Sequence, residues 1–402
     1  MSAATLTAER FPPPRPAERP LGIPEDYRRM FAGARVPHVL LPSGRTAHLL
    51  GRYEDVRAVL TGPVSADGAH PGFPMVRAGT ASTSNALSFF RMDGADHRRY
   101  RRLVAADFSV AQVARMRPRL ERIVDELIDG MLAGDQPADL ATMIALPLPT
   151  QVICHILGVP YTDRASFQQL SDTLTRGPEH GRESFLAAVM RLQAYVEKLA
   201  VAKRDEPGDD LLSALIENFD HDDSLDRRQL AAMVLLLLVA GHETTASMIT
   251  LGALALIEHP HVAEAVRADP GVTPNVAEEL LRYISIAQWV PRVATEEIVL
   301  GDTTIRAGEG LIALPLMANR DPDVFANPDA LEPYRWNADR HLGFGFGPHQ
   351  CLGVQLARME LQVVFEALAC RLPGLRLAVP VGELALRQQS AMFGVESLPV
   401  TW

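Results

Sequence analysis

Apolar residues at spacings of three and four mark the middle of the chain as helical. The pattern recurs over residues 97–108, 110–132 and 148–159, and it predicts amphipathic helices there. Residues 224–258 hold no proline, so they predict a helix of ~50 Å at 1.5 Å per residue, ended by Pro260. Two further helices are predicted, one with Thr273 as its cap and Pro274 at its first position, and one over about 352–372.

A smaller β region is predicted at the two ends of the helical part. Residues 36–60 contain two short apolar runs separated by a turn at 42–45, which predict a hairpin followed by a helix. Residues 296–316 alternate apolar and polar side chains, and the carboxyl-terminal tail returns to short strands. Prolines over about 1–24 predict an extended arm that acts as a lid or strap before a helix at 25–34. The fold class is therefore mainly α with a smaller β region.

Composition and charge exclude several classes of protein. The 402 residues are 47% hydrophobic and 22% charged, which is enough to build a large core, and the length alone suggests two or three domains. A net charge of −10 argues against a surface that coats nucleic acid. The longest apolar run, Ala231–Ala240, is half of what a bilayer requires, so we expect no membrane anchor. The first twenty residues lack the apolar block of an export signal.

Three cysteines are scattered along the chain, which argues against a disulfide framework and favours a cytoplasmic protein. Cys154 and Cys370 have the surroundings of ordinary core thiols. Cys351 is different, because it follows a glycine-rich segment and comes just before a predicted helix. The amino terminus of a helix stabilises a thiolate, and a thiolate is a ligand for soft or redox-active metals. The simpler alternative is a small thiol in a glycine turn.

The segment around this cysteine resembles the signature of the cytochrome P-450 family. Residues 344–353 read Phe-Gly-Phe-Gly-Pro-His-Gln-Cys-Leu-Gly and match the form FGxGxHxCxG at every fixed position. The resemblance implies heme b (iron protoporphyrin IX) with Cys351 as the proximal iron ligand and O2 as co-substrate. It also implies that Phe344, Gly345 and Gly353 shape the loop and that His349 reaches a heme propionate. The implied fold is a single domain over 1–402, a helix-rich prism that encloses heme between a long central helix and the cysteine loop.

A second match lies in the middle of the long predicted helix, at Ala240-Gly241-His242-Glu243-Thr244-Thr245. An acid and an alcohol in a leucine-rich run are costly to bury without partners. The Thr244 hydroxyl can compete for the Ala240 carbonyl while Gly241 lets the helix open into a groove. The alternative is that Thr244 bonds back to its own helix and Glu243 points to solvent. In the resembling family this acid and alcohol deliver the protons that cleave dioxygen.

Two further sets of residues match the family. Glu279 and Arg282, three apart on one helix face, match a buried structural pair that a downstream arginine completes. We expect Ala330 to occupy that arginine's position, which leaves Arg335 or Arg340 to replace it. His97, Arg101 and Arg292 match residues that hold the heme propionates.

The resemblance also implies partners. Exposed arginines at 98, 99 and 102 would form a basic patch that docks an acidic ferredoxin, so that electrons come from NAD(P)H through a ferredoxin reductase and ferredoxin. We expect a monomer. The substrate pocket would be apolar, which suits a lipophilic small molecule, and the glycine- and serine-rich residues 62–85 would form its entrance, with plain disorder as the alternative. Its predicted lining is Phe73, Met75, Phe89, Phe90, Leu236, Val239, Ala240, Ile286, Trp289, Val290, Met392 and Phe393.

The predicted reaction is insertion of one oxygen atom, as hydroxylation or epoxidation, in secondary-metabolite biosynthesis. A xenobiotic-degrading monooxygenase and a peroxide-driven heme-thiolate enzyme are the alternatives within the same chemistry. The remote alternative is a heme-binding protein without turnover.

Replacement of Thr244 by alanine tests the proton-delivery interpretation. We expect Thr244→Ala to bind heme normally but to lower product formed per electron by about tenfold or more, with peroxide released instead. Parallel measurement of NAD(P)H consumed, peroxide and product decides this. Unchanged coupling would mean that Thr244 does not organise protons.

Overall fold

In the computed structural model, which describes residues 6–7, 11–41, 44–76, 88–163, 169–170, 182–222, 225–226 and 228–402, one long helix crosses the whole molecule. This helix, α9 (Arg228–Glu258), carries apolar side chains on all sides, and most of its residues are buried. A helix that is apolar all round has to lie inside a protein or a membrane. Its most apolar window is 72% buried by the rest of the chain, as in the core helix of a globular protein.

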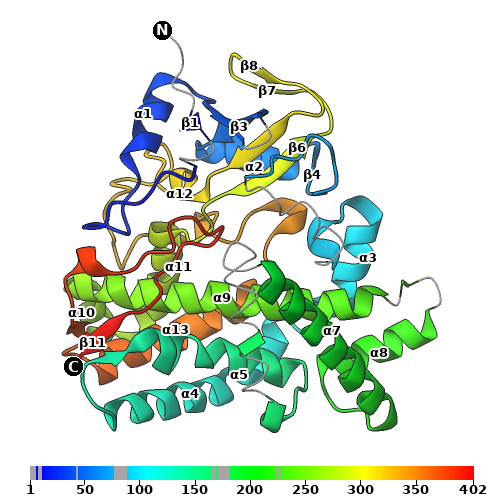
Figure 1. The fold of residues 1–402 in the computed structure, drawn as a ribbon. Helices are drawn as coiled ribbons and strands as arrows, with labels where there is room; N and C mark the ends of the chain where they lie inside the picture. Colours follow the sequence, from blue (N-terminus) through cyan, green and yellow to red (C-terminus); the bar gives the residue numbers. More distant parts are fainter. Residues whose placement is uncertain are drawn as a thin grey trace.

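The other helices pack around α9 (Figure 1). α5 (Pro147–Ile156), α11 (Thr273–Ile284), α13 (Val354–Arg371), α7 (Arg182–Asp205), α8 (Leu211–His221) and α10 (Pro260–Ala268) contact it directly. α4 (Val110–Leu132) packs on α13, and α3 (Gly94–Ala105) packs on α8. The predicted helices are confirmed to within a few residues at each end. The prediction for Thr273 is wrong in detail, because Thr273 is the first helical residue and Val272 is the cap.

The β region lies on the other side of α9, together with α1 (Glu25–Gly33), α2 (Tyr53–Thr61) and the short α12 (Pro315–Ala318) (Figure 1). Its six-stranded sheet has the order β1-β2-β3-β9-β6-β4. β3 pairs in parallel with β9, and β9 pairs antiparallel with β6, which sets Arg292 opposite Leu311. The strands are β1 (Leu6–Thr7), β2 (His38–Leu40), β3 (Thr46–Leu50), β4 (Val64–Ser65), β6 (Val290–Ala294) and β9 (Gly310–Ala313).

Two small sheets complete the β structure, and the second of them lies apart from the six-stranded sheet, near the carboxyl terminus (Figure 1). β7 (Ile298–Leu300) and β8 (Thr303–Ile305) form a hairpin, and β10 (Arg376–Leu377), β11 (Pro399–Thr401) and β5 (Ala138–Asp139) form a three-stranded sheet. The predicted hairpin, the alternating segment 296–316 and the carboxyl-terminal strands are thus confirmed. The predicted loop 62–85 contains β4 and is described only as far as residue 76, so its remainder lies outside the described residues.

The amino-terminal arm is fastened to the carboxyl-terminal part of the chain. Phe11 is buried against Trp289 with ring centroids 5.9 Å apart. Arg15 is buried and donates to the carbonyl oxygens of Ile284 and Ser285 at 3.1 and 3.0 Å, at the end of α11. Its guanidinium also lies 3.9 Å from the centroid of the Phe393 ring. Because these contacts hold both terminal nitrogens of a buried guanidinium, the arm is a fixed part of the fold over the residues described.

A buried cluster of charges ties α11 to the segment that leads to the cysteine loop. Glu279 accepts two hydrogen bonds from Arg282, at 2.7 and 2.8 Å, and a third from Arg335 at 3.0 Å. All three side chains are almost completely removed from water. Arg282 also donates to the carbonyl oxygens of Asn319, Pro328 and Ala330. Such a cluster is tolerable only because every donor has an acceptor.

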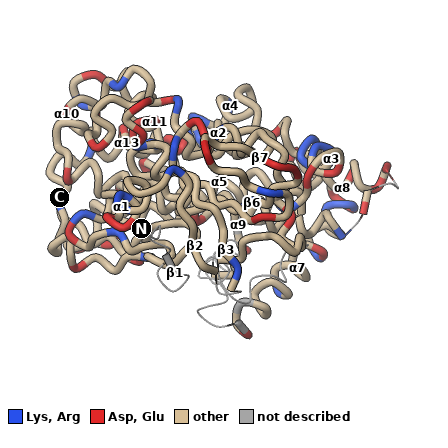
Figure 2. The backbone as a smooth tube through the Cα atoms, turned by 90° about the horizontal axis from the view of Figure 1, so that it is seen from above, with Lys and Arg blue, Asp and Glu red and all other residues tan. Residues whose placement is uncertain are grey.

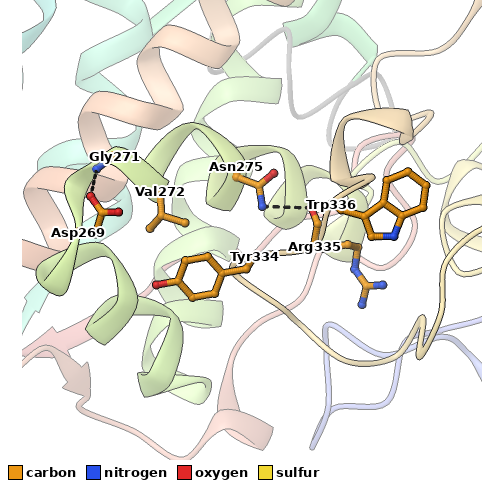
Figure 3. Close-up of a pocket in the computed structure, with 7 residues that line it drawn as sticks. All are labelled: Asp269, Gly271, Val272, Asn275, Tyr334, Arg335 and Trp336. Carbon is orange, nitrogen blue, oxygen red and sulfur yellow. Dashed lines mark hydrogen bonds between the residues drawn. The ribbon is translucent and has the colours of Figure 1, made fainter.

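Of the two expected replacements, Arg335 is confirmed and Arg340 is not, and Ala330 does not mark a lost arginine. The arginine that completes the cluster is Arg335, in a segment Pro333-Tyr334-Arg335-Trp336 that itself has the proline, arginine and aromatic residue of the family's pattern. Asn275 of α11 holds this segment, because it donates to the carbonyl oxygens of Pro333 and Arg335 at 2.8 and 3.2 Å. Figure 3 shows the bond to Arg335. Trp336 points away from the core and is 83% exposed, beside an open surface cavity of about 320 Å³.

Removal of one member of this cluster tests its role. We expect Glu279→Ala to destabilise the protein by about 3–5 kcal/mol, because it strands Arg282 and Arg335 as buried unpaired cations. Denaturant unfolding followed by circular dichroism measures this, and Glu332→Ala, which removes a half-exposed carboxylate bound to Arg335, is the matched control. A soluble Glu279→Ala protein of unchanged stability would refute the assignment.

Candidate active site

The cysteine loop is a tight turn that only glycine permits at two positions. Gly345 and Gly347 have φ of +69° and +73°, a region that residues with a side chain rarely adopt. A Cβ on Gly347 would also lie 2.5 Å from the carbonyl oxygen of Leu60 at the end of α2. The loop closes on itself because the Cys351 backbone N–H donates to the Phe344 carbonyl at 2.9 Å. Cys351 is thereby held three residues before α13.

The loop is also attached to α11. Arg358 of α13 makes two hydrogen bonds to Glu278, at 2.7 and 2.8 Å, and its guanidinium lies 5.5 Å from the centroid of the Phe344 ring. His341 joins the same carboxylate at 3.2 Å. Phe344 thus packs against charged groups that are themselves paired. This packing fixes the position of the chain segment that leads to Cys351.

The three cysteines differ in their surroundings. Protein atoms around the Cys351 sulfur raise the pKa of its thiol by desolvation, while the Gly353 backbone N–H and the Arg101 guanidinium act to lower it. Cys351 nevertheless has exposed surface, and Cys154 is buried as predicted. The prediction that Cys370 is a core thiol is wrong, because Cys370 is exposed.

Basic side chains from three elements gather beside the loop. His97 of α3 stacks on His349 with ring centroids 4.2 Å apart, and Arg101, one turn later, donates to the Gln350 carbonyl at 2.6 Å. Arg292 of β6 is buried and donates to the carbonyl of its neighbour Pro291 at 2.8 Å. Burial and the nearby cations lower the pKa of His97 to about 4 and that of Arg292 to about 10.

One carboxylate lies in this group. Asp93, at the start of α3, accepts from His349 at 3.0 Å and from Ser65 at 2.6 Å. Burial alone would raise the Asp93 pKa, but the bonds from His349, Ser65 and the Ala66 backbone lower it to about 2. The buried Nε2 atom of His97 has no hydrogen-bond partner within the described part of the chain. The buried Arg292, the partly buried Arg101 and the unsatisfied ring nitrogen of His97 outnumber the one carboxylate beside them, and such a set of donors suits an anionic ligand.

The polar segment of α9 lies where the burial of this helix is interrupted. Ala240 is exposed, and Gly241, Glu243 and Thr244 are partly exposed, although residues 232–238 and 245–256 are buried. The Thr244 hydroxyl donates to the Ala240 carbonyl at 2.6 Å. The helix continues without a break here, so the predicted local opening is wrong. Glu243 does not simply point to solvent, because it pairs with Arg387 at 2.8 Å.

These observations fit a large flat anionic group. Cys351 and Ala240 are both exposed, and α13, which follows Cys351, packs against α9, which carries Ala240. Cys351 would hold the predicted heme. The cations near Cys351 have the chemistry to neutralise two carboxylates.

Comparison with known proteins decides the family. The family model described as "Cytochrome P450" matches residues 38–270 and 271–371. The chain belongs to the cytochrome P450 family. It is 45% identical to cytochrome P450-SU2 of Streptomyces griseolus, over 98% of this chain and 100% of that protein. Membership makes the chain a monooxygenase of the heme-dependent kind.

Solved structures agree with this P450 fold. The crystal structure of GfsF has a TM-score of 0.91 at 41% identity and covers 98% of this chain and 99% of its own. Mycinamicin VIII C21 methyl hydroxylase MycCI from Micromonospora griseorubida also has a TM-score of 0.91, at 39% identity, and covers 99% and 100% of the two chains. The mainly α fold with a smaller β region is thus confirmed.

The predicted pocket residues of this P450 fall into different surroundings. Phe90 is 47% exposed, with Arg91 stacked over it. Trp289 and Phe393 pack in the core under the amino-terminal arm. The remaining predicted pocket residues are buried or half-buried: Phe73, Met75, Phe89, Leu236, Val239, Ile286, Val290 and Met392.

Two charged residues of this region escaped the sequence analysis. Arg387, which binds Glu243, lies 144 positions away in the sequence, and no motif around it indicates this contact. Glu360 of α13 is buried and bonds Thr245 of α9, and burial raises its pKa to about 8. A carboxyl in the apolar run of α13 could have been noticed by the reasoning that singled out Glu243.

The buried Glu360 predicts a pH dependence of stability. Its pKa is about 8 in the folded chain against 4.5 in an unfolded one, so the folded state binds this proton more tightly. The contribution of Glu360 to stability is therefore full below pH 4.5 and is lost as pH rises through about 8. We expect Glu360→Gln to stabilise the protein on the order of 4 kcal/mol at pH 9 and hardly at all at pH 5. Urea unfolding at the two pH values measures this, and an equal effect at both would contradict it.

Proposed function

We propose that this P450 is a heme-thiolate monooxygenase that inserts one atom of O2 into a lipophilic small molecule, by hydroxylation or epoxidation. The observation that carries the proposal is Cys351, held in a glycine turn before α13 with buried cations beside it. Heme bound to this thiolate would supply the oxygen-activating redox chemistry. The residues of the chain would bind and orient that group and control the protons.

The heme-binding residues are assigned by their chemistry. Cys351 would be the iron ligand, with Phe344, Gly345 and Gly353 shaping its loop. His97, Arg101, His349 and Arg292 would bind the propionates, because these basic side chains gather beside the loop with one carboxylate, Asp93, among them.

Glu243 and Thr244 would move protons. The Thr244 hydroxyl donates to the Ala240 carbonyl, at the exposed turn of α9. Glu243 would take a proton from water and pass it on toward the Thr244 side of the helix. This intact acid and alcohol pair favours oxygen over peroxide as the oxidant.

The electron donor would be a ferredoxin reduced by NAD(P)H through a ferredoxin reductase. Arg98 and Arg102 are exposed on α3, whereas Arg99 pairs with Asp222 at 3.0 Å. Figure 2 shows basic residues of α3 on the surface at one end of the molecule. A small acidic protein would be attracted to these arginines. We propose that the protein is cytoplasmic, where it would meet such a ferredoxin.

The substrate class follows from the apolar lining of the predicted pocket and from relatives. One relative is named pentalenic acid synthase of Streptomyces avermitilis, at 41% identity, and another is the mycinamicin hydroxylase. Both names belong to secondary metabolism, so we propose tailoring of a secondary metabolite. Oxidation of a xenobiotic would use the same residues.

Reduction and reconstitution test the proposal. We expect the reduced protein under carbon monoxide to show the red-shifted Soret band of thiolate-bound heme, and Cys351→Ser to lose that band. With NADPH, ferredoxin reductase, ferredoxin and O2 it should oxidise apolar test substrates at a rate that falls as salt rises. A wild type without the Soret band would refute heme-thiolate ligation. Product formed only with peroxide would refute the ferredoxin-dependent reaction. Heme binding without any product would indicate a heme-binding protein without turnover.

A further inference from the structure

An arginine from the carboxyl-terminal turn holds the carboxylate of the central helix. Nη1 of Arg387 lies 2.8 Å from Oε1 of Glu243, and Nη2 donates to the Ser247 hydroxyl at 2.7 Å. Glu243 and Ser247 are one helical turn apart, so the guanidinium spans that turn of α9. The side chains of Arg387 and Glu243 are only 22% and 13% exposed, so water competes little with their ion pair. Two bonds in one plane fix the direction of the guanidinium.

The turn has a slot for this side chain. The Arg387 backbone N–H donates to the Gly394 carbonyl at 2.8 Å, and Leu386 and Val395 form a β-bridge across the turn. A Cβ on Gly394 would lie 2.9 Å from both Cζ and Nε of Arg387 and closer still to a terminal nitrogen. The guanidinium therefore lies flat against Gly394, in space that any side chain would take.

Two distant segments hold the turn itself. The side chain of Gln388 and the main chain of Arg15 exchange two hydrogen bonds of 2.9 Å. Gln288, after α11, donates to the carbonyl oxygens of Gln388 and Ser390 at 2.8 and 2.7 Å. The residue next to Arg387 is thus bound on both sides, so the position of its guanidinium over α9 is set by the fold and does not depend on Glu243 alone.

We propose that Arg387 is a positioning residue for proton delivery by Glu243, an inference that rests on the proposed function. Arg387 holds the Glu243 carboxylate beside the turn of α9 that carries Thr244. For each delivery one carboxylate oxygen leaves the guanidinium and takes a proton from a water molecule, whose O–H bond breaks and whose hydroxide is reprotonated from bulk solvent. Glu243 then gives its proton to an acceptor on the Thr244 side and returns as carboxylate to Arg387, so that the net change is one proton moved from solvent to that acceptor.

A double-mutant cycle on the holoenzyme tests this role. Arg387→Met should raise the share of electrons lost as peroxide about fivefold, and Arg387→Lys, which keeps the charge, should restore part of the coupling. In a Glu243→Gln background Arg387→Met should add nothing, because both changes act through the same carboxylate. Arg204→Met, which breaks a 2.8 Å ion pair with Asp220 on α7 and α8, is the matched control. A peroxide rise that persists in Glu243→Gln would show that Arg387 acts by another route and would overturn the proposal.

Gly394→Ala provides a variant that keeps every charge. Its methyl group should push the guanidinium off the slot and reproduce the peroxide yield of Arg387→Met, while heme content stays normal. Normal coupling in Gly394→Ala would mean that the position of Arg387 is unimportant, which overturns the proposal.

Thermal unfolding gives a readout that needs no turnover. Arg387→Met and Glu243→Gln should lower the melting temperature by less together than the sum of their separate shifts, and an additive result would overturn the pairing. A wild type that forms no product would refute the proposed function, and the role of Arg387 with it. A wild type that turns over normally while Arg387→Met leaves peroxide unchanged would refute the role of Arg387 alone.

Discussion

The complete burial of Arg282 is the constraint on which much of this P450 depends. A guanidinium removed from water must have all its donors satisfied, and Arg282 meets this by binding Glu279 and three backbone carbonyls of the segment 319–330. Arg335 shares the same carboxylate. The result is that α11 cannot move relative to the chain that leads into the cysteine loop. Glu278, the neighbour of Glu279, binds Arg358 of α13 and so extends the same anchorage to the helix that follows Cys351.

The cofactor region shows the opposite balance of charge. Around Glu279 every cation has its acceptor, whereas beside Cys351, among the described residues, Arg292, Arg101 and the unsatisfied Nε2 atom of His97 stand against the single carboxylate of Asp93. A folded chain tolerates such an excess when a ligand supplies the missing negative charge. The family provides that ligand in heme. The contrast between the two clusters therefore separates a structural network from a binding site on physical grounds, independent of the signature sequence.

Glu243 on the central helix is neither fully buried, as Glu279 is, nor without a cation. Glu243 has a partner in Arg387, but the pair keeps some contact with water, which a group that exchanges protons requires. Its partner comes from a turn that the amino-terminal arm and the segment after α11 hold in place. The two ends of the chain, far from the cysteine loop in sequence, thereby act on the polar segment of α9.

The sequence by itself determined the helices, the glycine turn that holds Cys351, the position of Glu243 and Thr244 on α9 and the pairing of Glu279 with Arg282. These features depend on residues a few positions apart, whose spacing fixes which side chains share a turn or a face. Tertiary structure alone decided that Arg335 completes the buried cluster, that Arg387 holds Glu243, that Phe90 and Cys370 are exposed, and that Phe393 lies under Arg15. Each of these contacts or exposures depends on segments that are distant in the chain. Periodicity carries no information about which of several arginines meets a given carboxylate, because packing and desolvation choose among them only once the chain has folded.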